Sequence, residues 1–110
     1  MYFEIYSEIV ILFWWLFRSY SESNFDINFW RTKSGLEVDF ILGKGQTALE
    51  VKGTKRVDKT DLKGIRAFIE EYSPKKAIIV CNEKKERITD NISIIPWKKF
   101  LTDLWQNKII

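Results

Sequence analysis

The chain has 110 residues, of which 45% are hydrophobic and 30% charged, and its net charge is +3. This size and composition fit one folded globular domain rather than a disordered chain. Histidine is absent and Cys81 is the single cysteine, which excludes Ser-His-Asp catalysis, an internal disulfide and most zinc sites. We expect Cys81 to be a reduced core residue of a cytoplasmic protein. The positive charge mildly favours an anionic partner such as nucleic acid, although a small excess of lysine is also ordinary for a soluble protein.

The first expected element is a helix over residues 2–19 that contains a continuous apolar run, Ile9–Phe17. A helix that spans a bilayer needs about 20 apolar residues, so we predict no membrane insertion. A helix that is apolar all round is normally buried, yet a domain this small cannot bury so much surface by itself. We therefore predict a homodimer, or a surface for another module, built on Phe13, Trp14 and Phe17.

Three strands are expected next, over residues 25–31, 36–42 and 47–52. Apolar residues alternate with the others in each segment, which is the period of a half-buried strand. The run Gly43-Lys44-Gly45 supplies a turn between the second and third segments, and Gly53 ends the third. The second and third strands are therefore predicted to form a hairpin.

The second half of the chain is predicted to alternate helices and strands. A helix is expected over residues 58–72, where apolar residues recur every three or four positions, with Asp58 or Thr60 as its cap. Residues 77–81 are typical of a buried central strand. A charged loop over 82–91 and a short strand over 92–95 follow, and Pro96 opens a last helix. The order α-β-β-β-α-β, with a short extra strand and a terminal helix, predicts an α/β fold.

The predicted hairpin carries several charged residues that suit chemistry. Period two places Glu37 and Asp39 on one face, and Glu50 and Lys52 on one face. If those faces coincide, three carboxylates and one ammonium cluster, which suits divalent-metal binding and phosphodiester hydrolysis. The alternative is a cross-strand salt bridge between Lys52 and Asp39 or Glu37, which contributes little at a surface.

A longer pattern surrounds these residues. It consists of Trp-Arg-Thr-Lys-Ser-Gly at 30–35, Glu-Val-Asp-Phe at 37–40 and Leu-Glu-Val-Lys-Gly at 49–53. This pattern resembles the PD-(D/E)XK nuclease superfamily. More narrowly, it is similar to the uncharacterised C-terminal domain carried by a large group of bacterial and archaeal AAA+-type ATPases, and the similarity continues through residues 57–68 and 94–101. The resemblance implies a restriction-endonuclease-like core.

The resemblance also implies roles for individual residues. Asp39 and Glu50 would be ligands of Mg²⁺ or Mn²⁺, and Lys52 would be the catalytic lysine. An acidic residue on the first helix often completes the metal site in that superfamily, which makes Glu4 the candidate and Glu8 the reserve. The alternative for Glu4 is an exposed residue that interacts favourably with the helix dipole.

The ATPases of that group carry a P-loop, whereas this chain has no Gly-x-x-x-x-Gly-Lys-Ser/Thr motif. We therefore expect residues 1–110 to be a single nuclease-like domain, either a C-terminal fragment or a free-standing copy. An ATPase module in cis or in trans is the expected protein partner.

Basic residues indicate a second feature of the chain. Lys59, Lys63 and Arg66 fall at spacings of four and three, beside Lys55 and Arg56. Such a stripe can follow a phosphate backbone, so these residues are predicted to bind DNA. The alternative is that they form the solvent face of an amphipathic helix.

Two functions are consistent with these patterns. The first is metal-dependent hydrolysis of DNA phosphodiesters by an endonuclease or exonuclease. The alternative is a catalytically inactive nuclease-like module that mediates DNA binding or oligomerisation for an ATPase. Trp30, Trp97 and Trp105 could stack on bases, although their periodic positions favour packing in a core or an interface.

Overall fold

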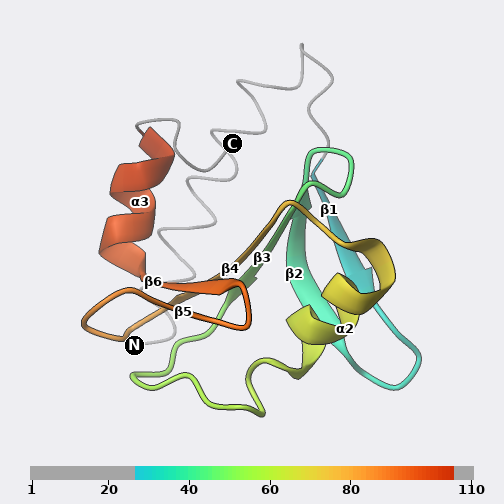
Figure 1. Ribbon diagram of the computed structural model, residues 1–110, viewed down its shortest axis with the longest axis horizontal. Helices are drawn as coiled ribbons and strands as arrows, with labels where there is room; N and C mark the ends of the chain where they lie inside the picture. The colour runs from blue at the N-terminus through green and yellow to red at the C-terminus, as the bar shows by residue number, and fades with distance from the viewer. Residues whose placement is uncertain (1–26, 106–110) are drawn as a thin grey trace.

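The computed structural model describes residues 27–105 (Figure 1). The predicted first helix lies outside the described residues, and with it the metal-ligand candidates Glu4 and Glu8 and the apolar segment Ile9–Phe17. The homodimer expected from that segment therefore stays a prediction. Within residues 27–105, no helix is long and apolar enough to span a membrane.

The described part has a mixed α/β architecture of one six-stranded sheet and two helices (Figure 1). The elements, in chain order, are β1 (Ile27–Arg31), β2 (Glu37–Leu42), β3 (Thr47–Val51), α2 (Lys63–Tyr72), β4 (Lys76–Cys81), β5 (Arg87–Thr89), β6 (Ile92–Pro96) and α3 (Trp97–Trp105). This arrangement confirms the predicted α/β class and the hairpin.

The sheet combines an antiparallel and a parallel half. Its strand order is β1-β2-β3-β4-β6-β5. The strands β1, β2 and β3 pair antiparallel in sequence order, whereas β3, β4 and β6 run parallel. Because the carboxyl ends of parallel strands meet at one edge of a sheet, the residues that follow β3, β4 and β6 come together there.

The two helices cover opposite faces of the sheet (Figure 1). The helix α2 connects β3 to β4 and packs Ile65 and Phe68 against Ala48 and Ile79 in the main apolar cluster. Trp30 from β1 contacts Phe68 edge-on, with ring centroids 5.5 Å apart. Trp30 thus packs against the core, one of the two roles left open for it. On the other face, α3 contacts β4 and β6 and buries Phe100 completely.

The strand β5 corrects the prediction of a loop over residues 82–91. It pairs antiparallel with β6. The turn between the two strands consists of Asp90 and Asn91, whose φ angles are 49° and 64°. Two consecutive residues with positive φ are typical of the tight turns that join hairpin strands, and Asn and Asp tolerate that conformation. This short turn signal lies inside a strongly charged segment, which made the segment resemble a loop.

The start of α2 also differs from the prediction. The helix begins at Lys63 instead of Asp58, and its N-cap Leu62 makes no side-chain capping bond. Asp58 and Asp61 instead accept hydrogen bonds from each other's backbone N–H, at 3.0 and 3.1 Å. These reciprocal bonds stabilise a turn ahead of the helix, because short polar side chains compete with helical backbone bonding.

The start of α3 is likewise shifted. Pro96 is the last residue of β6, pairs with Cys81 and does not open the helix. Proline is compatible with this place because a strand end leaves its missing N–H outside the hydrogen-bonded ladder.

Candidate functional site

The candidate site lies at the carboxyl end of β3, where the predicted metal ligands and the predicted catalytic lysine come together. After β3 ends at Val51, the Lys52 N–H donates to the Val80 carbonyl at 2.8 Å. The Asn82 N–H then donates to the Thr54 carbonyl at 2.9 Å. The backbone that carries Lys52 is therefore held along β4, which limits where its side chain can reach.

A β-bulge positions Asp39 on the neighbouring strand. The register between β1 and β2 shifts between Asn28 and Trp30, so that Asp39 and Phe40 together stand opposite one residue of β1. Bulges bend a strand and change the direction of its side chains, and they are frequent beside functional sites. Beyond the last recorded backbone pair of the hairpin, Phe40 with Leu49, the Asp39 carboxylate accepts a hydrogen bond from the Val51 N–H at 2.8 Å.

Glu50 is the most deeply buried carboxylate of the site. The residue is only 3% exposed and stands opposite Ile79 of β4. Its Oε1 lies 3.6 Å from the Lys52 ammonium, whereas its Oε2 is buried with no hydrogen-bond partner among the residues the structure describes. A buried oxygen in that condition costs free energy, so a native structure that contains one calls for an explanation such as an ion or a ligand.

Burial dominates the electrostatics of both carboxylates. The pKa of Glu50 is raised to about 7, chiefly by desolvation; Lys52 opposes the change, and the nearby Asp39 adds to it. Desolvation also raises the pKa of Asp39, against the lowering effects of the Val51 hydrogen bond and of Lys52. The Lys52 side chain is 31% exposed, so the ammonium is accessible to solvent beside two carboxylates that are largely hidden from it.

Glu37 does not join this group, contrary to the predicted cluster of three carboxylates. Its side chain is half exposed and its Oε2 lies 3.2 Å from Arg31. Within residues 27–105, no three acidic or cysteine side chains gather as a metal-binding group. Glu37 is near enough to raise the pKa of Asp39 and of Glu50, but its exposed carboxylate pairs with Arg31 instead of joining them. The site that the structure brings together is Asp39, Glu50 and Lys52.

The predicted basic stripe is not one continuous helical face. Lys59 lies in the turn before α2, and Lys63 is the first residue of that helix. Arg66 forms an ion pair with Asp90. Lys55 and Arg56 are exposed on the loop after β3. Nucleic-acid binding by these five residues stays a prediction.

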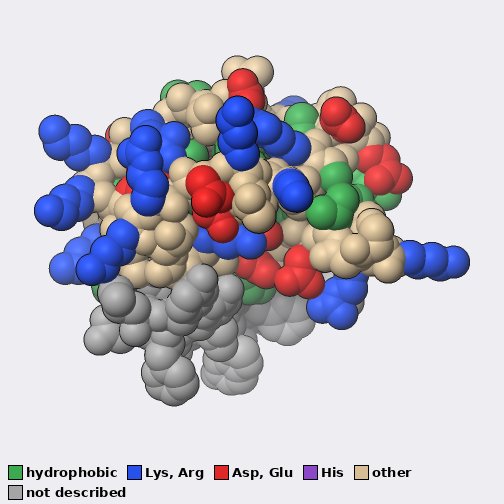
Figure 2. All heavy atoms as spheres, turned by 90° about the horizontal axis from the view of Figure 1, so that it is seen from below, with side chains coloured by type: hydrophobic (Ala, Val, Ile, Leu, Met, Phe, Trp, Pro, Cys, Tyr) green, Lys and Arg blue, Asp and Glu red, His purple; other side chains and the backbone are tan. Residues whose placement is uncertain are grey.

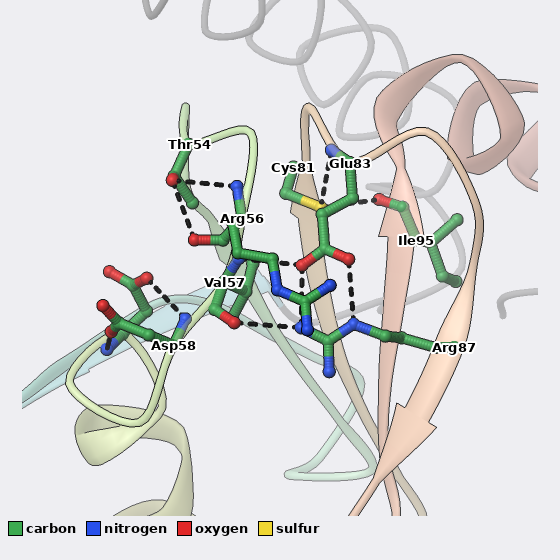
Figure 3. Close-up of polar contacts among 9 residues, drawn as sticks. Thr54, Arg56, Val57, Asp58, Cys81, Glu83, Arg87 and Ile95 are labelled. Carbon is green, nitrogen blue, oxygen red and sulfur yellow. Dashed lines mark hydrogen bonds and ion pairs between the residues drawn. The ribbon is translucent and has the colours of Figure 1, made fainter.

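A charged network that sequence reasoning missed fixes the loop after Lys52 (Figure 3). The buried Glu83 carboxylate accepts the Val57 N–H at 2.8 Å and two bonds from the Arg87 guanidinium, each of 2.8 Å. Arg87 also donates to the Val57 carbonyl at 2.9 Å. Hydrogen bonding by Arg87 lowers the pKa of Glu83. Glu83 and Arg87 are four residues apart in a charged segment, but no sequence signal placed them beside Val57.

The model of a family described as a domain of unknown function, DUF4143, matches residues 9–100. A search of curated proteins and a search of solved structures each found no match. The matched range includes Asp39, Glu50 and Lys52.

Proposed function

The chain belongs to the DUF4143 family of domains of unknown function, and we propose that it is a metal-dependent hydrolase of DNA phosphodiester bonds. The observation that carries the proposal is the Glu50 carboxylate. It is buried beside an ammonium and a second carboxylate, and its Oε2 has no hydrogen-bond partner within the described part of the chain. A protein keeps such a group at a cost to its stability, and functional sites are where strongly shifted pKa values concentrate.

The donor atoms of the site suit Mg²⁺ or Mn²⁺. Asp39 and Glu50 offer carboxylate oxygens, which hard divalent cations prefer over nitrogen or sulfur. Magnesium sites in enzymes that act on phosphates often use one or two carboxylates, with water and substrate oxygens completing the octahedron. The unpartnered Glu50 oxygen supplies a place for one such bond. The cation, when bound, would offset charge on the scissile phosphate and lower the pKa of the attacking water.

Lys52 is the residue that would act on the water. The Lys52 ammonium lies 3.6 Å from Oε1 of Glu50, and 31% of the Lys52 side chain is exposed to solvent. An ammonium in this position can orient a water by donating a hydrogen bond to it, or stabilise the negative charge that develops on the phosphate. Only the neutral amine form of Lys52 could take the proton of the water. Asp39 and Glu50 would then position the metal, and Lys52 would position the water that attacks the phosphate.

We also propose that the domain has a restriction-endonuclease-like core. In support, the antiparallel hairpin with Asp39, Glu50 and Lys52 leads directly into the parallel unit β3–α2–β4. This order supports the β-β-β-α-β part of the α-β-β-β-α-β arrangement that the resemblance to PD-(D/E)XK nucleases implies; the predicted first helix lies outside the described residues.

The deciding experiment is cleavage of supercoiled plasmid DNA in the presence of Mn²⁺. Wild-type protein should nick the plasmid, EDTA should abolish nicking, and Lys52→Ala should lower the rate by roughly 10²–10⁴-fold. Lys44→Ala is the matched control, because Lys44 is an exposed lysine in the hairpin turn, and it should cleave at the wild-type rate.

Equal cleavage by wild type and Lys52→Ala would identify the activity as a contaminant and refute the proposal. Absence of both cleavage and Mn²⁺ binding would favour the alternative of an inactive module that binds DNA or mediates oligomerisation for an ATPase. Direct measurement of Mn²⁺ binding by calorimetry separates these two outcomes.

A further inference from the structure

Two hollows flank the loop over residues 82–86, at the carboxyl ends of β4 and β6. One lies between this loop and the start of α3, where Trp97, Lys98 and Lys99 line it. The other lies between the same loop and the segment Lys55–Arg56. Each has a volume of about 660 Å³. Ligands of open α/β sheets commonly bind in crevices at this edge.

Positive charge dominates the walls of both hollows. The basic residues that line them include Lys55, Arg56, Lys84, Lys85, Lys98 and Lys99. Figure 2 shows Lys and Arg side chains crowded on the side where Figure 1 places β5, β6 and α3. Charge of one sign lining a hollow raises the local concentration of an anionic ligand.

The acidic residues of the walls are already engaged. Glu83 is buried in its bonds to Val57 and Arg87 (Figure 3). Glu86 lies 3.9 Å from Lys99. In contrast, Lys55, Lys84, Lys85 and Lys98 make no ion pair with any carboxylate in the part of the chain that the structure describes. Four ammonium groups are therefore available to an external anion.

Trp97 adds an aromatic surface to the same walls. It is half-buried at the first position of α3, and the Lys98 ammonium lies 5.7 Å from the centroid of its ring. Aromatic side chains next to basic ones are the combination that single-stranded nucleic acids use, because every base has a face that can stack and every nucleotide carries a phosphate.

The hollows are tied to the candidate catalytic site through the backbone. The side-chain amide of Asn82, which lines both hollows, donates to the Gly53 carbonyl at 3.4 Å. Gly53 directly follows Lys52, whose N–H is bonded to Val80. Together with the bonds of Glu83 to Val57, these contacts hold the hollows at one position relative to the Lys52 backbone.

We propose that the hollows on either side of the loop 82–86 bind a single strand of nucleic acid, with Lys84, Lys85 and Lys98 contacting phosphates and Trp97 stacking on a base. The volume of each hollow is in the range of sites for one small molecule, about 300–1,000 Å³, which has room for a nucleotide or two. The role of this binding, to guide a strand past Lys52, rests on the proposed nuclease function. Binding itself requires no cleavage.

The test is fluorescence anisotropy with a labelled oligonucleotide of about 16 nucleotides, in EDTA to prevent cleavage. The double variant Lys84→Glu/Lys85→Glu should bind roughly tenfold more weakly or worse, and its slope of log affinity against log salt should fall by about 1.4. Lys44→Glu/Lys75→Glu is the matched control, because it reverses two exposed lysines near the amino ends of β3 and β4, away from the hollows. It should bind within twofold of the wild type.

Two further variants test the contacts separately. Trp97→Leu should weaken binding roughly fivefold or more without changing the salt slope, because stacking releases no counterions. If Trp97→Leu fails to fold by circular dichroism, Lys98→Glu serves instead and should lower both affinity and slope. Equal losses in the two lysine pairs, or tighter binding of a duplex of the same sequence than of the single strand, would overturn the inference.

The inference and the proposed function can fail separately. Wild-type protein that binds the strand in EDTA but never cleaves DNA in Mn²⁺ would refute the nuclease function and support strand binding by the hollows. Wild-type protein that cleaves plasmid but shows no affinity for the single strand would refute only the proposal that the hollows bind a single strand.

Discussion

Replacing Glu50 by glutamine tests the electrostatics of the candidate site without reference to activity. Burial raises the pKa of Glu50 from its ordinary value of 4.5 to about 7, so the folded protein binds a proton there more tightly than the unfolded chain does. The contribution of Glu50 to the free energy of unfolding is therefore fully present below pH 4.5 and is lost as the pH rises through 7. Each pKa unit corresponds to about 1.4 kcal/mol. The ionised Glu50 thus destabilises the fold by about 3 kcal/mol at pH 8.

Glu50→Gln has nearly the same shape and cannot ionise. The free energy of unfolding of the variant should lie within about 1 kcal/mol of the wild type near pH 5 and exceed it by up to about 3 kcal/mol at pH 8. The assay is urea unfolding followed by circular dichroism from pH 5 to pH 8.5, in EDTA. Glu70→Gln, at an exposed position of α2, is the control and should follow the wild type across the range.

Metal should offset most of this difference. With Mn²⁺ at about 100 times its dissociation constant, binding should stabilise the wild type by about 2.7 kcal/mol at pH 8. Glu50→Gln should gain less, because an amide oxygen is a poorer ligand than a carboxylate for a hard cation. A stability difference between variant and wild type that stays constant with pH would refute the reasoning, since burial of Glu50 would then not oppose its ionisation.

Three further substitutions test the surroundings of the site. Asp39→Asn should weaken Mn²⁺ binding, measured by calorimetry, and plasmid cleavage together; loss of cleavage with metal affinity unchanged would contradict its role as a ligand. Arg87→Ala should lower the free energy of unfolding in urea by about 1–3 kcal/mol, because the Glu83 carboxylate then keeps only its hydrogen bond from Val57. An unchanged free energy of unfolding would count against the network. Gly64→Ala should destabilise by about 1–3 kcal/mol in the same assay, because a Cβ there would lie 2.2 Å from the Glu37 carbonyl oxygen; an unchanged urea midpoint would show that α2 shifts freely.

Local patterns in the sequence were sufficient to predict the elements around the site. Alternating apolar residues and the glycine turn predicted the β2–β3 hairpin, and the continuous apolar run predicted β4 as a buried central strand. These features could be predicted because the side-chain period and the turn conformation depend on residues adjacent in the chain. Asp39, Glu50 and Lys52 lie within that hairpin and its exit, so their proximity followed from the same local information.

The tertiary structure decided which charged groups are buried and which are exposed. The bulge at Asp39 and Phe40 arises from pairing with β1, whose register no local period specifies. Glu50 is buried because β3 lies between β2 and β4 and is covered on both faces. Glu83 meets Val57 across 26 positions of chain. Strand order and cross-chain hydrogen bonds depend on long-range packing, because residues far apart in sequence meet only when the whole sheet assembles.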